Sequence, residues 1–171
     1  MKEKQNTKNS IKEDLIFLGL KIIALIALLA VTFLFIFGIY RCSDNIMSPS
    51  FKDGDLAIYY RLQKDFQPSD VVVIEKDGEK QIRRIVAKAG DEVDITEDGI
   101  KINGYLQQEN EIYSKTLPYV EGITFPIILG QNEYFVLGDN RTNAKDSRIY
   151  GTVKQEEIKG IVITLIRRRG L

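Results

Sequence analysis

The chain of 171 residues contains no histidine, no tryptophan and a single cysteine, Cys42. Without histidine, Ser-His-Asp and Cys-His catalysis and the usual zinc sites are excluded. One cysteine permits neither an intramolecular disulfide nor a Cys-x-x-Cys motif. Lys+Arg and Asp+Glu both number 24, so the net charge gives no reason to expect nucleic acid as a partner. We expect no metal and no cofactor.

Charged residues are also absent from 22–40, a run of 19 mainly apolar residues that 15–20 extend toward the N-terminus. At about 1.5 Å per residue, a helix of this length crosses the roughly 30 Å hydrocarbon core of a bilayer. A cleaved secretory signal has only about 7–15 apolar residues before a small-x-small site. Here the run is longer and ends in Gly-Ile-Tyr-Arg. The sequence therefore predicts one retained transmembrane helix at 15–40.

Lysines concentrate before this run, and the positive-inside rule then places the N-terminus in the cytoplasm. We expect a single-pass protein of the cell membrane, with lipid around its helix. A polar cytoplasmic tail without regular structure is expected at 1–14 and an extracytoplasmic domain at 41–171. The lysines are Lys2, Lys4, Lys8 and Lys12.

Beyond the anchor the pattern becomes extended. Short segments rich in β-branched and aromatic residues alternate with turn sequences such as Asp77-Gly78 and Asn103-Gly104. Such close spacing is typical of an all-β sheet system or barrel. Residues 104–130 are less regular and are interpreted as an excursion from the sheets. The predicted strands are 56–60, 71–74, 82–86, 92–95, 100–102, 134–137 and 158–166.

Residues 43–51 read Ser-Asp-Asn-Ile-Met-Ser-Pro-Ser-Phe and are followed by Lys-Asp-Gly-Asp. This stretch resembles the signature of type I signal peptidases, Ser-Met-x-Pro-Thr/Ser and then Gly-Asp. The family's nucleophilic serine is replaced by Ile46. The matching residues are Met47, Pro49, Ser50, Gly54 and Asp55.

Two further stretches carry the resemblance. Residues 82–91 are similar to the family segment Lys-Arg-Val/Ile-x-x-x-x-Gly-Asp, with Arg83 at the position of the catalytic lysine. Residues 138–148 are similar to Gly-Asp-Asn-Arg-x-x-Ser-x-Asp-Ser-Arg, with Ala144 at the serine that hydrogen-bonds that lysine. The resemblance covers about residues 15–171. It implies a mainly β, signal-peptidase-like domain of the Gram-positive type on one transmembrane helix.

The three differences fall on three positions that cooperate in one proton transfer. In a Ser-Lys mechanism the hydroxyl gives its proton to a neutral amine as it attacks the scissile carbonyl. Isoleucine offers no nucleophile, and arginine stays charged because its pKa exceeds about 12. Ala144 lacks the hydroxyl that would orient the base. We therefore expect no catalytic residues and interpret Ile46, Arg83 and Ala144 as degenerate positions.

Two neighbouring residues are the fallback catalytic groups, with Ser48 as nucleophile and Lys145 as base. Ser48 lies two residues from Ile46, which is about 6.6 Å along an extended segment. This displacement is much larger than the distance of roughly 3–3.5 Å that nucleophilic attack requires. Lys145 is the better substitute base, because Lys88 should face the other side of a regular strand. We prefer to interpret Ser48 as a turn residue before proline.

The matched residues can serve the fold without catalysis. The resemblance implies that Met47 and Pro49 shape the floor of a peptide groove. It implies an ion pair between Arg84 and Asp139. A brace of the same loop by Asp146 and Arg148 is also expected.

The leading hypothesis is a membrane-anchored pseudoenzyme whose groove binds an extended polypeptide by strand addition. The resemblance is strongest to the signal-peptidase-like protein of Gram-positive pilus operons, which implies a chaperone-like role in pilus subunit assembly beside a sortase. The alternative is an active serine-type signal peptidase that cleaves leader peptides from secreted preproteins. A third interpretation is a purely structural membrane-anchored β domain.

Overall fold

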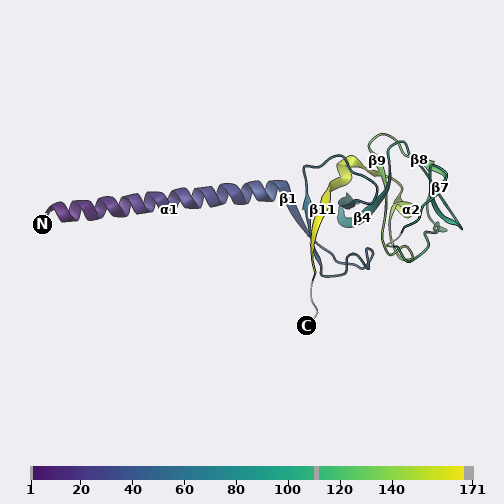
Figure 1. Cartoon of the computed structure of the whole chain (residues 1–171), viewed down its shortest axis with the longest axis horizontal. Helices are drawn as coiled ribbons and strands as arrows, with labels where there is room; N and C mark the ends of the chain where they lie inside the picture. Colours follow the sequence, from purple (N-terminus) through teal and green to yellow (C-terminus); the bar gives the residue numbers. More distant parts are fainter. Residues whose placement is uncertain (1, 110–111, 168–171) are drawn as a thin grey trace. The chain divides into compact units, whose positions relative to one another are not determined.

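The computed structural model describes residues 2–109 and 112–167, with side chains from residue 12 onward. The chain divides after Ile36 into two compact units, a single helix and a β-rich unit that begins at Phe37. Figure 1 shows the helix α1 and the strands of the β-rich unit.

Helix α1 spans Lys2–Ile36. Its segment Lys12–Ile36 contains an 18-residue stretch with a mean hydropathy of 2.7, and this length and composition are those of a membrane-spanning helix. The prediction of an unstructured tail at 1–14 is wrong for the described residues, because the helix already begins at Lys2. Lysine, glutamate and glutamine are good helix formers, and no proline or glycine precedes Gly19.

The predicted end of the helix at residue 40 is also wrong. Residues Phe37–Arg41 form strand β1, which pairs over its whole length with β2. The apolar run is therefore shared between a helix and a strand. Hydrophobicity alone does not separate the two, since both need apolar residues.

The larger sheet has seven antiparallel strands in the order β1-β2-β11-β3-β4-β9-β10. Strands β3 and β4 form a hairpin whose turn residues Asp77 and Gly78 both have positive φ, as a type I′ turn requires. Besides β1, the bounds are β2 Leu56–Tyr60, β3 Val71–Lys76, β4 Glu79–Lys88, β9 Glu133–Leu137, β10 Val153–Lys154 and β11 Ile158–Ile166.

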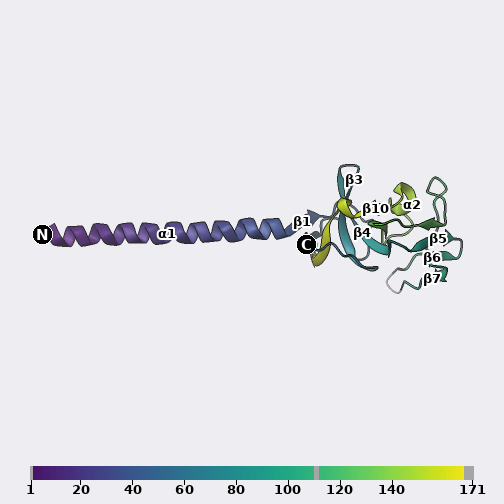
Figure 2. The ribbon, with the colours of Figure 1, turned by 90° about the horizontal axis from the view of Figure 1, so that it is seen from above.

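A second, four-stranded sheet has the order β7-β6-β5-β8 and lies at the end of the unit away from β1 (Figure 2). Its strands are β5 Glu92–Thr96, β6 Gly99–Ile102, β7 Tyr105–Leu106 and β8 Ile127–Ile128. The short helices α2 Ser147–Tyr150 and η1 Gln155–Glu157 complete the unit. The mainly β fold and all seven predicted strands are confirmed. The described part of 104–130 contains only β7 and β8, as its irregular sequence indicated.

Three apolar clusters hold the sheets together. One lies between β3, β4 and β9 and contains Ile85 and Val136; another joins the second sheet to β9 through Phe135. The third contains Met47, Tyr59 and Ile82 and lies beside the segment 43–51. This last cluster fixes the motif segment against strands β2 and β4.

Replacement of Gly38 by alanine is expected to destabilise the fold by about 1–3 kcal/mol, because overpacking a filled core costs this much. A Cβ at Gly38 would overlap the ring of Tyr59, which is buried at 1% exposure. Gly130→Ala is the matched control, since a Cβ there would meet only the side chain of Glu133, whose nearest atom lies 3.1 Å away. Denaturant unfolding in detergent measures both variants. Equal stability of the two would contradict the packing described here.

Candidate functional site

Two of the three degenerate positions meet at a glycine. A Cβ built on Gly138 would lie 2.6 Å from both the Cβ of Ala144 and the Cγ2 of Ile46. The backbone N–H of Asn140 also donates to the carbonyl of Ile46 at 2.9 Å. The side chains at 46 and 144 therefore close over the same backbone turn, and glycine is required there because a Cβ has no room.

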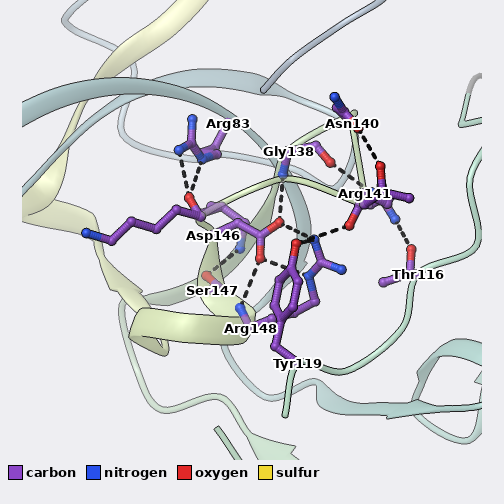
Figure 3. Close-up of polar contacts among 12 residues, drawn as sticks. Arg83, Thr116, Tyr119, Gly138, Asn140, Arg141, Asp146, Ser147 and Arg148 are labelled. Atoms are coloured by element: carbon purple, nitrogen blue, oxygen red, sulfur yellow. Dashed lines mark hydrogen bonds and ion pairs between the residues drawn. The ribbon is translucent and has the colours of Figure 1, made fainter. Parts of the chain in front are cut away.

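The third degenerate position, Arg83 on β4, is buried at 1% exposure. Its Nε and Nη2 donate to the carbonyl of Lys145 at 3.1 and 2.7 Å (Figure 3). Its Nη1 donates to the carbonyl of Ile82 at 2.6 Å. Within the described residues it forms no ion pair. Arg83 thus reaches the residue next to Ala144 as a charged donor bonded to backbone oxygens, and such a group cannot accept a proton.

The backbone amide of Ile46 is also hydrogen-bonded. The N–H of Ile46 donates to Oδ1 of Asp44 at 2.9 Å. A backbone N–H at such a position can stabilise the oxyanion of an acyl-transfer intermediate only if it is free to point at that oxygen. In this structure the amide is bonded to a carboxylate instead.

The fallback residues lie in unremarkable surroundings. The N–H of Ser48 donates to the carbonyl of Asn45 at 3.0 Å, so Ser48 belongs to a turn. The side chain of Lys145 is exposed, while its carbonyl accepts from Arg83. No hydrogen bond joins the Ser48 hydroxyl to the Lys145 ammonium in the described part of the chain.

The two expected groove residues differ in environment. Met47 is buried at 2% exposure, whereas Pro49 is exposed. The space beside Met47 is a cavity of about 10 Å³. Nearby, burial raises the pKa of Cys42 to about 11, helped by the carboxylate of Asp55, so this cysteine remains a thiol at neutral pH.

The expected ion pair between Arg84 and Asp139 is present. Nε and Nη2 of Arg84 donate to the two carboxylate oxygens at 2.8 and 2.7 Å. The hydroxyl of Ser50 donates to Oδ2 of Asp139 at 2.6 Å, and Nη1 of Arg84 donates to the carbonyl of Ser69. This cluster links all three family-like stretches, and the sequence alone gave no role to Ser50.

Asp146 organises the loop that follows Asp139. Its buried carboxylate accepts from the N–H of Gly138 at 3.1 Å and from Nε and Nη2 of Arg148 at 3.0 and 2.8 Å (Figure 3). It also caps helix α2 by accepting from the N–H of Arg148. The expected brace is therefore built around Asp146.

Two arginines of this loop bind the irregular segment 104–130. Arg141 is buried and bonds to Glu109 and Thr116. Arg148 donates to the carbonyl of Leu117, and its guanidinium lies 4.4 Å from the centre of the Tyr119 ring. Sequence reasoning missed these contacts, because nothing in 105–130 marks Glu109 or Tyr119 as a partner of a residue some 30 positions later.

Comparisons with known proteins agree with these stretches. A family model described as "Signal peptidase, peptidase S26" matches residues 15–166. The chain is 26% identical over 166 residues to a signal peptidase I of Bacillus licheniformis, covering 90% of this chain and 89% of that protein. It is 28% identical over 142 residues to signal peptidase IB of Staphylococcus aureus, covering 72% and 74%. A crystal structure of a signal peptidase I from Enterococcus faecalis is 24% identical, with a TM-score of 0.49, covering 58% of this chain and 97% of that one.

Replacement of Asp139 by asparagine is expected to lower the free energy of unfolding by about 3 kcal/mol, because it leaves a largely buried guanidinium without its anion. The Asp139 side chain is 0% exposed and that of Arg84 16%. Asp98→Asn is the control, since Asp98 is 78% exposed and lies 4.0 Å from Lys101, and its loss should cost below about 0.5 kcal/mol. Chemical denaturation compares the two; similar losses would contradict a structural role for the Arg84 pair.

Proposed function

Because the chain belongs to the signal peptidase (peptidase S26) family, we propose that it keeps this family's scaffold to bind extended polypeptides without cleaving them. The single observation that carries the proposal is the state of Arg83. A buried guanidinium bonded to two backbone carbonyls stands where a proton acceptor is needed. Ile46 and Ala144 remove the nucleophile and the orienting hydroxyl from the same place.

The free edge of β4 supplies a surface for strand addition. The N–H and carbonyl of Ile85 bond with the carbonyl of Asp70 and the N–H of Ser69, on the side of β3. Backbone groups alternate between the two sides of a strand, so those of Ile82 and Lys80 face away from β3. Strand β9 pairs only with the part of β4 from Arg84 onward. An extended chain can therefore add beside residues 80–82.

We further propose where the protein works and what it binds. Helix α1 anchors it as a single-pass protein of the cell membrane, with the lysines before the apolar run in the cytoplasm and the β unit outside. Its client is a pilus subunit, assembled beside a sortase, as the resemblance to the pilus-operon proteins implies. Loss of the nucleophile, of the base and of the orienting hydroxyl supports a holding role over a cutting role.

An active signal peptidase that cleaves preproteins is the second candidate. The relatives named above favour it, because they are called signal peptidase I. This function would require the Ser48 hydroxyl as nucleophile and the Lys145 amine as base. The two make no hydrogen bond to each other in the described residues.

The full chain in lipid vesicles, incubated with a leader-bearing preprotein, is expected to release no mature product on a denaturing gel. Signal peptidase IB of Staphylococcus aureus serves as the positive control. Cleavage that Ser48→Ala abolishes would establish the second candidate. In the native membrane, a pilus subunit should co-purify with the chain, and its clean absence would remove the pilus role.

The double variant Ile46→Ser and Arg83→Lys is expected to stay at least about 100-fold slower than the positive control. It restores a hydroxyl and an amine, but Ala144 still cannot orient the amine and the amide at position 46 is still bonded to Asp44. Loss of one oxyanion donor alone slows acyl transfer by about 10²–10³. A rate near that of the positive control would contradict the divergence of the rest of the site.

A further inference from the structure

The two carbonyl oxygens on the free edge of β4 are already bonded within the protein. The carbonyl of Ile82 accepts from Nη1 of Arg83 at 2.6 Å. The carbonyl of Lys80 accepts from the hydroxyl of Tyr40 at 2.8 Å. Unpaired strand edges attract further strands, and proteins protect them by covering them. Here two side chains occupy the places that the amides of an added strand would take.

Tyr40 reaches this edge from the opposite end of the sheet. It lies on β1, and three strands separate β1 from β4 in the sheet order. Its bond to Lys80 shows that the sheet curls until β1 approaches the free edge of β4. Partial burial raises the pKa of Tyr40 above its usual value, so the hydroxyl keeps its proton and can donate at neutral pH.

The space between the two strands is almost filled. The cavity there measures about 10 Å³, close to the volume that holds a single water. While Tyr40 stays bonded to Lys80, this cavity has no room for a side chain of an added strand, so docking requires Tyr40 to move aside. Its lining consists of Tyr40, Cys42, Asp44, Met47, Phe51 and Ile82.

We infer that the free edge of β4 is a docking edge held closed by Tyr40 and Arg83. It accepts an extended polypeptide with two free N–H groups two residues apart, which replace the tyrosine hydroxyl and the guanidinium on the carbonyls of Lys80 and Ile82. This inference rests on the proposed function and adds the chemistry that selects the client. A client with proline at either position lacks an N–H and is rejected.

Tyr40→Phe tests the closure, since it removes one hydroxyl and keeps the ring. The full chain in nanodiscs is titrated into a fluorescein-labelled, amidated heptapeptide of alternating threonine and valine, and anisotropy reports binding. The variant should bind about fivefold more tightly than the unchanged chain, the factor that one neutral hydrogen bond contributes. The same peptide with all its amides N-methylated should bind neither protein.

Tyr105→Phe is the matched control, because Tyr105 lies on the second sheet and is 77% exposed; it should bind like the unchanged chain. Equal binding by the unchanged chain and the Tyr40 variant would overturn the closure and leave the proposed function standing. Undiminished binding of the N-methylated peptide would overturn pairing at the edge. Failure of every folded variant to bind the unmodified peptide would overturn polypeptide binding itself.

Discussion

The structure depends on what a buried guanidinium can and cannot do. It keeps its charge and offers five donors in a fixed plane, so it must be surrounded by oxygens. Arg83 finds them on the backbone, and Arg148 finds them on the carboxylate of Asp146. The Arg83 bonds tie strand β4 to the carbonyl of Lys145, and the Asp146 carboxylate also accepts from the N–H of Gly138, just after β9. The constraint that holds this loop in place also keeps a charged guanidinium, and no neutral amine, at position 83.

The residues that match the family signature and the residues that differ from it make different kinds of contact. The Arg84–Asp139–Ser50 cluster and the Asp146 brace join segments distant in the sequence, and their loss would open the fold. Ile46 and Ala144 lie at Gly138, where small changes of side chain alter chemistry without disturbing these links. The proposed holding role rests on this separation, because these links do not involve the side chains of Ile46 and Ala144.

The sequence predicted the strands well, because alternating apolar residues and Asp-Gly and Asn-Gly turns are local signals. The Arg84–Asp139 pair was expected only from the resemblance to the signal peptidase family. Sequence reasoning misplaced the end of the helix, since β1 continues the same apolar run and becomes a strand only by pairing with β2. It gave no role to Tyr40, Arg141 or Glu109. Their contacts depend on the curl of the sheet and on the path of the excursion, which no local pattern encodes.

Nitrogen-15 NMR of the Arg83 side chain in the full-length protein tests the central claim most directly. A guanidinium bonded through Nε, Nη1 and Nη2 to buried carbonyls should show a slowly exchanging Nε–H and separate Nη signals, up to alkaline pH. Exposed Arg41 provides an internal reference in the same spectrum. Fast exchange and averaged Nη signals like those of Arg41 would contradict the account, because Arg83 would then leave its position open.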